Sequence, residues 1–213
     1  MKNIYAHLNM RACLRLVRLA LFLLTALTTW QTTHAAAHSV EIGVLAFRGH
    51  DHAMQRWQPV AQFLNQTLPE HEFSIIPLNL EQMRKATSAG DIDFLLTNPG
   101  NYVLLESKYG VSRIATLKRH WQGETFSQYG AVIFSRRDNP SITELADLKD
   151  HSLMVVNNNA FGGFQMAWRE LKRAGVDPFN DLESLQYNGF PQDSIVYSVL
   201  SGEVDAGTVR TGL

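Results

Sequence analysis

The sequence predicts an α/β protein made of two similar lobes. Short apolar runs alternate along the chain with segments whose apolar side chains recur every three or four residues, which is the order of strands and helices in this fold class. The pattern Gly, acid, aliphatic, Asp occurs twice, at residues 90–93 and 202–205. Each copy follows a predicted helix and opens an apolar strand. Two such α/β units imply a cleft between them.

The first lobe is predicted over residues 38–130. Asn79, with Gln82 three residues later, resembles a capping box. Pro59 should either kink the first helix or mark its first turn, and Trp57 is expected in the core. The expected elements are, in order, a strand at 40–47, helix at 54–68, strand at 73–78, helix at 80–90, strand at 93–97, helix from about 102, and strand at 113–119.

Four polar residues at the ends of these strands are candidate ligand contacts. Arg48 follows the first strand, and Thr97 ends the third. Residues 98–101 form a predicted tight turn into the next helix, where the amides of Asn98 and Asn101 could donate to a ligand beside the helix N-terminus. The other interpretation is that Asn98 only fixes the turn.

The connection between the lobes adds an aromatic candidate. Residues 120–126 are interpreted as a polar excursion, and residues 128–134 as a strand that leaves the first lobe. Doubly wound sheets bind ligands at the carboxyl ends of strands, where the connections diverge. Tyr129 lies at the predicted crossover and could stack on a ligand there.

The second lobe is predicted over residues 131–213 and repeats the design. A capping box at residues 141–144 opens a short helix that ends near Lys149. The expected elements that follow are a strand at 153–156, a helix from 161, a strand at 185–187, a helix from 193, and a strand at 205–209.

An Asn-rich turn at residues 157–159 joins the first strand of this lobe to its helix. The helix face is predicted from Phe164, Trp168, Leu171 and Ala174, and Gly175 stands where a C-terminal cap belongs. The first helical turn leaves backbone N–H groups unpaired. Candidate ligand contacts in this turn are Asn158, Asn159 and Phe161. The alternative is an ordinary strand-to-helix turn.

The N-terminus predicts export. Basic residues precede an apolar run at 19–27 and small residues at 35–37, which is the order of a secretory signal peptide spanning residues 1–37. An uncleaved anchor is the alternative. Cleavage would remove four of the 19 basic side chains and none of the 20 acidic ones, so the mature chain would have a net charge of −5. This negative charge does not suggest nucleic-acid binding. The single cysteine, Cys13, would also be removed, so the mature chain would have no disulfide. A bacterial periplasm fits these features.

No pattern for catalysis stands out. His50 and His52 lack accompanying metal ligands, and neither a nucleophile elbow nor a phosphate-binding loop is present. Asp91 and Asp93 could be mistaken for a catalytic pair, but the same pattern recurs in the second lobe, which indicates a structural role. We therefore expect a binding protein without cofactor or metal rather than an enzyme.

The segments GDIDFLLTNPGNYV, FGGFQMAWREL and GEVDAGTVRTG give the chain a resemblance to phosphonate-binding periplasmic solute-binding proteins, and still more to the sensor domain of tetrathionate-sensing histidine kinases. The resemblance implies a two-lobed type II periplasmic binding fold that closes on a small oxyanion. Phosphonate binders carry hydroxyls and a His where this chain has residues 159–162 and Gln192. Phosphonate itself is therefore the less favoured ligand, and Gln192 joins the candidate contacts.

Arg210, in the VRTG segment, is the candidate charge partner for a sulfur oxyanion or carboxylate, because a guanidinium binds two oxygens at once. An interlobe salt bridge is the alternative role. The resembling domains return to the first lobe after the second, so the chain is expected to be C-terminally truncated. In the sensors they continue into membrane and kinase modules. The leading hypothesis is thus the sensor input of a two-component histidine kinase, and the alternative is the receptor of an ABC importer working with a permease. An enzyme on the same fold is the third.

Overall fold

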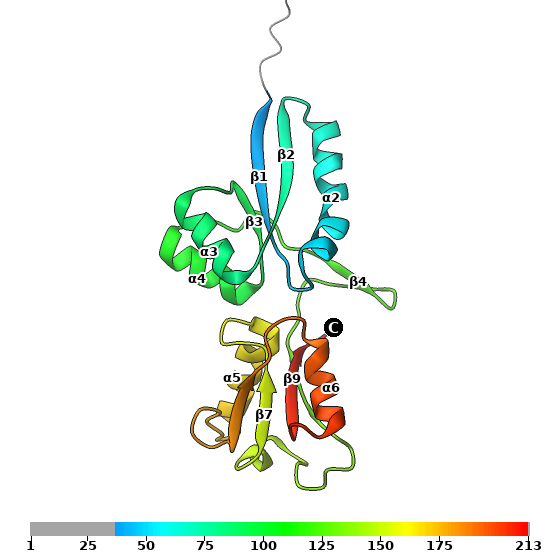
Figure 1. Cartoon of the computed structure of the whole chain (residues 1–213), viewed down its shortest axis with the longest axis vertical. Coiled ribbons are helices and arrows are strands. Elements are labelled where there is room, and N and C mark those ends of the chain that lie inside the picture. The colour runs from blue at the N-terminus through cyan, green and yellow to red at the C-terminus, as the bar shows by residue number, and fades with distance from the viewer. Residues whose placement is uncertain (1–36, 213) are drawn as a thin grey trace, which may run out of the picture. The chain divides into compact units, whose positions relative to one another are not determined.

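Two separate sheets organise the protein, and a short hairpin lies between them in sequence (Figure 1). The computed structural model describes residues 37–212, so the predicted signal peptide and its uncleaved alternative lie outside the described residues apart from Ala37. From Ser39 onward the chain clusters into one unit that contains both sheets. We call the part around the first sheet the first lobe and the part around the second sheet the second lobe.

The first lobe contains a three-stranded sheet with the order β2-β1-β3, in which β1 and β3 are parallel. Val44 and Ile75 are buried against Ala53 and Ala61 of the first helix, and Trp57 packs on this cluster as expected. The elements are β1 (His38–Leu45), α2 (His50–Thr67), β2 (His71–Leu78), α3 (Leu80–Ala89), β3 (Phe94–Leu96) and α4 (Pro99–Tyr109).

The helix ends show which local predictions were right. Asn79 and Gln82 form the predicted capping box, with each side chain accepting the other residue's backbone N–H. Pro59 lies inside α2, which already begins at His50, so the interpretation that this proline marks the first helical turn was wrong. The helix extends upstream because residues 50–53 continue its turns and bury Ala53.

The connection after α4 differs from its prediction. Residues 111–118 form no strand, and Ile114 is 78% exposed, so this segment has neither a strand partner nor a buried face. The predicted polar excursion is instead an antiparallel hairpin of β4 (Arg119–Trp121) and β5 (Glu124–Phe126). Gln122 and Gly123 supply its turn with positive φ angles of 50° and 82°.

The second lobe contains a four-stranded sheet with the order β6-β9-β7-β8. Strands β7, β8 and β9 are parallel, and β6 runs antiparallel to β9. The predicted helix at 141–149 is only a 3₁₀ turn, because Glu144 and Asp147, rather than Ser141, form its cap. The elements are β6 (Ala131–Ser135), η1 (Leu145–Leu148), β7 (Ser152–Val155), the π-helix η2 (Phe161–Gln165), α5 (Met166–Arg173), β8 (Ser184–Tyr187), α6 (Asp193–Ser201) and β9 (Ala206–Arg210).

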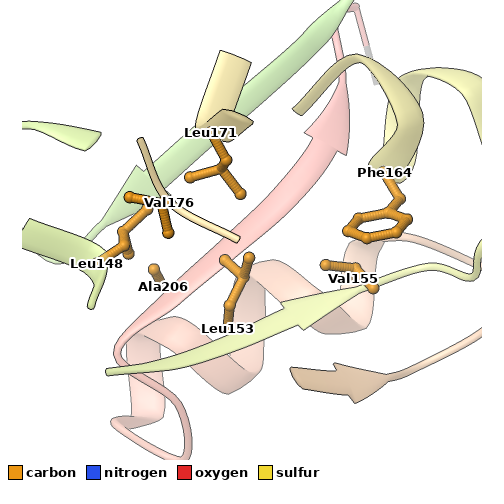
Figure 2. Close-up of a cluster of buried hydrophobic side chains, with 7 residues drawn as sticks. All are labelled: Leu148, Leu153, Val155, Phe164, Leu171, Val176 and Ala206. Atoms are coloured by element: carbon orange, nitrogen blue, oxygen red, sulfur yellow. The ribbon is translucent and has the colours of Figure 1, made fainter. Parts of the chain in front are cut away.

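The core of the second lobe fills the space between its sheet and the α5 segment (Figure 2). All four residues of β7 are buried, as expected for an interior parallel strand. Phe164 and Leu171 are fully buried, as the predicted helix face requires. At the position between them, Ala167 is buried instead of the predicted Trp168, which is 39% exposed. The cluster consists of Leu148, Leu153, Val155, Phe164, Leu171, Val176 and Ala206.

The repeated Gly-acid-aliphatic-Asp pattern has the same structural role in both lobes. Gly90 and Gly202 end α3 and α6 in the left-handed conformation, with φ of 75° and 78°. Asp93 then accepts the backbone N–H of Glu41 in β1 at 2.8 Å, and Asp205 accepts that of Ser152 in β7 at 2.9 Å. The carboxylates therefore join strands, which confirms the structural interpretation. Within residues 37–212, no helix has the length and apolar character needed to span a bilayer.

Candidate functional site

Arg210 is the centre of the candidate site. It ends β9 opposite Ala131 of β6, and the Oε1 atom of Gln192 accepts its backbone N–H at 2.9 Å. Gln192 is 5% exposed and directly precedes α6, so the helix start and the strand end are held together. The sequence-predicted contacts Gln192 and Arg210 are thus neighbours in the structure.

The guanidinium of Arg210 is partly buried and reaches the first lobe. Its carbon lies 5.5 Å from the ring centroid of Phe47, which follows β1. Burial, followed by the nearby charge of Arg119, lowers the pKa of Arg210 from its usual value, although the group stays protonated at neutral pH. Across the described part of the chain, no carboxylate forms a salt bridge with this guanidinium. Within residues 37–212, its side-chain donors are therefore not used by an anionic group.

Aromatic side chains and a close backbone contact surround this arginine. Tyr129 and Phe161 meet edge to face at 5.5 Å between ring centroids. A Cβ atom on Gly162 would lie 2.6 Å from Cβ of Arg210 and 2.9 Å from Cε2 of Tyr129, so only glycine allows this approach. Burial raises the pKa of Tyr129 to about 12, which keeps its phenol neutral and able to donate a hydrogen bond. Tyr129, Phe161 and Arg210 therefore form one group.

Arg48 and Asp193 form a salt bridge between the lobes. Two guanidinium nitrogens of Arg48 lie 2.8 and 3.1 Å from the two carboxylate oxygens of Asp193, the first residue of α6. This contact lowers the pKa of Asp193, with a smaller contribution from Arg210. The interlobe salt bridge considered for Arg210 is thus formed by Arg48 instead. Arg48 lies near Arg210, but its guanidinium is already paired with the carboxylate of Asp193.

The predicted contacts at the start of α4 bind one another. Asn98 is the N-cap of α4, and its side-chain oxygen accepts the backbone N–H of Asn101 at 3.0 Å. Asn101 is 2% exposed and donates its amide to Oγ1 of Thr97 at 3.0 Å. The observed contact of the Asn98 side chain is thus the one expected if this residue fixes the turn. The side-chain amide of Asn101 donates to Thr97 and is shielded from solvent.

The Asn-rich turn of the second lobe faces the start of α4. A Cβ atom on Gly100 would lie 3.3 Å from the backbone oxygen of Asn159 and 2.2 Å from Oε1 of Gln165. Asn158 accepts a hydrogen bond from the hydroxyl of Tyr187 at 2.9 Å. The two Asn-containing turns thus approach each other across the lobes, as the two-lobed interpretation requires.

A pocket of roughly 440 Å³ lies at the end of β1, and its lining includes Phe47, the ring that faces Arg210. Phe47, Arg48 and Phe190 line it, and the rings of Phe47 and Phe190 are 6.4 Å apart. Sequence reasoning missed Phe47, Phe190 and Asp193 as site residues. The position of Phe47 just after β1, where ligands gather in α/β sheets, was a usable signal. Nothing in the sequence pointed to Phe190, and Asp193 looked like an ordinary helix-start acid.

The two histidines in the first turn of α2 have ordinary contacts. His50 bonds to Asp51 at 3.1 Å, and the ring of His52 lies 6.4 Å from that of Phe47. Within residues 37–212, no three His, Cys, Asp or Glu side chains converge in a way that could hold a metal ion.

Comparisons with known proteins identify the family and the fold. Residues 42–213 match the model of the family described as ABC transporter, phosphonate, periplasmic substrate-binding protein. The tetrathionate sensor histidine kinase TtrS of Salmonella typhimurium is 37% identical over 176 residues, which are 82% of this chain and 29% of that protein. The chain thus spans less than a third of the length of this relative.

Two solved structures show the same fold at low sequence identity. The binding protein of an ABC phosphonate transporter from Pseudomonas aeruginosa has a TM-score of 0.62 at 12% identity, covering 82% of this chain and 58% of that one. PhnD1 from Prochlorococcus marinus, in complex with methylphosphonate, has a TM-score of 0.63 at 18% identity, covering 80% and 63%. The fold is the two-lobed type II periplasmic binding fold, and the chain belongs to the family of phosphonate-type periplasmic substrate-binding proteins.

Proposed function

We propose that this chain is the periplasmic sensor domain of a two-component histidine kinase and binds a small oxyanion between lobes at residues 38–130 and 131–213. One observation carries the proposal. Arg210 holds a partly buried guanidinium that no described carboxylate neutralises, at a point where residues of both lobes meet. A buried cation without a counter-ion is costly, and an anionic ligand would remove that cost.

The chemistry around Arg210 suits an oxyanion headgroup. A guanidinium presents parallel N–H donors to two oxygens of a carboxylate, sulfonate or phosphonate. The charges of Arg119 and Arg56 also act on Arg210, whereas Arg48 is paired with Asp193. Arg119 and Arg56 therefore favour an anion beside Arg210. Phe47 covers the guanidinium and reduces its contact with water, which strengthens a hydrogen bond to a bound anion.

The relation to a tetrathionate sensor kinase makes sulfur oxyanions the first ligand class to test. In such a sensor, the ligand promotes signalling only to the extent that it binds the closed lobes better than the open ones. The alternative function is the receptor of a phosphonate-type ABC importer, which membership of the family supports only at the level of the family. Ligand-dependent autophosphorylation of the protein expressed from its own locus would favour sensing. Loss of ligand uptake on deletion of that locus would favour transport.

Isothermal titration with tetrathionate, thiosulfate, methylphosphonate and acetate tests the binding proposal. We expect at least one of the sulfur oxyanions to bind and to raise the melting temperature, because a ligand of the native state stabilises it. Replacement of Arg210 by Ala should weaken binding by about 1.5–3 kcal/mol, the scale of a hydrogen bond to a charged group.

The matched control is Arg136→Ala, which removes a guanidinium that already pairs with Asp138 at 2.5 Å near the other end of β6. It should leave the affinity unchanged. Unchanged affinity in Arg210→Ala would remove this residue from the site. If none of the four anions bound, the proposed function would be wrong.

A further inference from the structure

We infer that Arg119 is a specificity-determining residue of the same site, which binds a second negative charge on the ligand while Arg210 binds the first. This inference rests on the proposed function, because it concerns which oxyanions the Arg210 site prefers. Arg119 begins the β4 hairpin, whereas Arg210 ends β9, so two distant parts of the sequence would supply the two cations. Doubly charged anions should then bind better than singly charged anions of the same shape.

Hydrogen bonds bring Arg119 to the strand end that carries Arg210. The Nη2 atom of Arg119 donates to the carbonyl oxygen of Gly212 at 2.8 Å, two residues beyond Arg210. Thr211, which lies between Arg210 and Gly212, exchanges two hydrogen bonds of 3.0 Å with Gly130 of the crossover segment. The Arg119 side chain is therefore tied to the residues that directly follow Arg210.

Tyr129 joins the two arginines into one cluster. A Cβ atom on Gly162 would lie within 3 Å of both Cβ of Arg210 and Cε2 of Tyr129. Burial raises the pKa of Tyr129 to about 12, and the charges of Arg210 and Arg119 act on this phenol in the opposite direction. Among residues 37–212, no acceptor takes a hydrogen bond from the Tyr129 hydroxyl, so this neutral donor remains available to a ligand.

The cluster carries two positive charges that the described part of the chain does not neutralise. Within residues 37–212, neither Arg119 nor Arg210 forms a salt bridge with a carboxylate. The contact of Arg119 with the Gly212 carbonyl uses only part of its N–H donors and leaves its charge intact. Among the nearby charges, that of Arg119 lowers the pKa of Arg210 most, as expected for two like charges that repel. A monoanion offsets one of these charges, whereas a dianion offsets both.

The dependence on ligand charge separates binding by Arg119 from a structural role. If Arg119 only held the hairpin to Gly212, its loss would weaken the binding of every ligand by the same factor. If it binds the second charge, its loss weakens the binding of a dianion more, because the Coulomb energy scales with the charge of the ligand. The ratio of dianion to monoanion affinity therefore isolates the electrostatic role.

Thiosulfate and methanesulfonate provide a matched pair of probes. Both have an –SO₃ headgroup, and they differ in a terminal sulfur that carries a second charge or a methyl group that carries none. Titration of the protein at low ionic strength gives the two dissociation constants, since salt screens such interactions. In Arg119→Gln, we expect the ratio of thiosulfate to methanesulfonate affinity to fall about tenfold, which lies between the bulk-water and protein-surface limits for nearby unit charges.

Two further variants control for folding and for long-range charge. Arg119→Lys keeps the positive charge, so it should restore most of the ratio that Arg119→Gln loses. Lys118→Gln removes the same charge from the neighbouring, exposed side chain, and it should leave the ratio unchanged. If methanesulfonate binds too weakly to titrate, the affinity for thiosulfate alone should fall in Arg119→Gln and recover in Arg119→Lys.

The possible failures of the inference and of the proposed function can be told apart. A ratio that stays constant in Arg119→Gln, that falls equally in Lys118→Gln, or that Arg119→Lys does not raise would overturn the inference while leaving the proposed function intact. Failure of thiosulfate and methanesulfonate to bind the unchanged protein would also overturn the inference. The proposed function would fail with it only if tetrathionate, methylphosphonate and acetate did not bind either.

Discussion

The paired aspartates of the two lobes allow a quantitative test of how the sheets are held together. Asp205 accepts two hydrogen bonds from Ser152, one from its backbone N–H at 2.9 Å and one from its hydroxyl at 2.7 Å. Within the described part of the chain, Asp93 accepts only one, from the backbone N–H of Glu41 at 2.8 Å, and is more exposed. Without the Asp205 carboxylate, the backbone N–H of Ser152 would lose its acceptor, and Ser152 is only 9% exposed to the water that could replace it. We expect Asp205→Ala to cost about 2–4 kcal/mol, and Asp93→Ala about 0.5–1.5 kcal/mol.

Urea unfolding followed by circular dichroism measures both variants, with the free energy extrapolated linearly to water. Acid pH provides a second readout, because hydrogen bonds from Ser152 lower the pKa of Asp205. A lowered folded-state pKa means that the stabilisation is complete above the unfolded pKa of about 3.9 and is lost as the pH falls through the folded value. The difference between Asp205→Ala and the unchanged protein should therefore shrink on acidification. Equal losses in the two variants, or a pH-independent difference, would refute this reasoning.

Two other substitutions test local structure by the same unfolding measurement. Gly163→Ala should lose about 1–3 kcal/mol, because its Cβ atom would lie 2.4 Å from Cγ2 of Val156 in the core, whereas Gly130→Ala, with no atom within 4 Å, should change little. Equal effects of these two would contradict the packing argument. Asn98→Ala should cost about 1 kcal/mol by removing the N-cap bond of α4. A cost near zero would show that the Asn98 side chain does not cap the helix.

Local signals in the sequence were enough to predict most of the fold. The capping box of α3 and the left-handed glycines after α3 and α6 depend on residues close in sequence, which is why they were predictable. The strand expected at 113–119 failed, because a strand needs a neighbour and the sequence does not say which segment will supply one. The helix expected at 141–149 is shorter for a different, local reason. Asp147 accepts the N–H groups of Thr143 and Glu144, so the cap starts three residues later than the Ser141 pattern suggested.

The candidate site was predictable only in part. Arg210, Tyr129 and Phe161 were selected from the ends and starts of elements, and the structure brings them together. The role of Arg48 could not be foreseen, because its partner Asp193 is 145 positions away and nothing in either local sequence indicates the pairing. Asn101 was predicted to donate its amide to a ligand, but tertiary packing buries this side chain, and the amide donates to Met83 and Thr97.

Hydrogen bonds join the segment that crosses between the two lobes to the residues that follow β9. Gly130 and Thr211 exchange two hydrogen bonds of 3.0 Å, one between backbone atoms and one to the threonine hydroxyl, directly beside the pairing of Ala131 with Arg210. Arg119, at the start of the hairpin, also donates to the carbonyl of Gly212 at 2.8 Å. A displacement of the crossover segment would therefore also displace Arg210 at the end of β9. The strand end that we propose to bind the ligand and the segment that links the lobes are therefore joined by three hydrogen bonds.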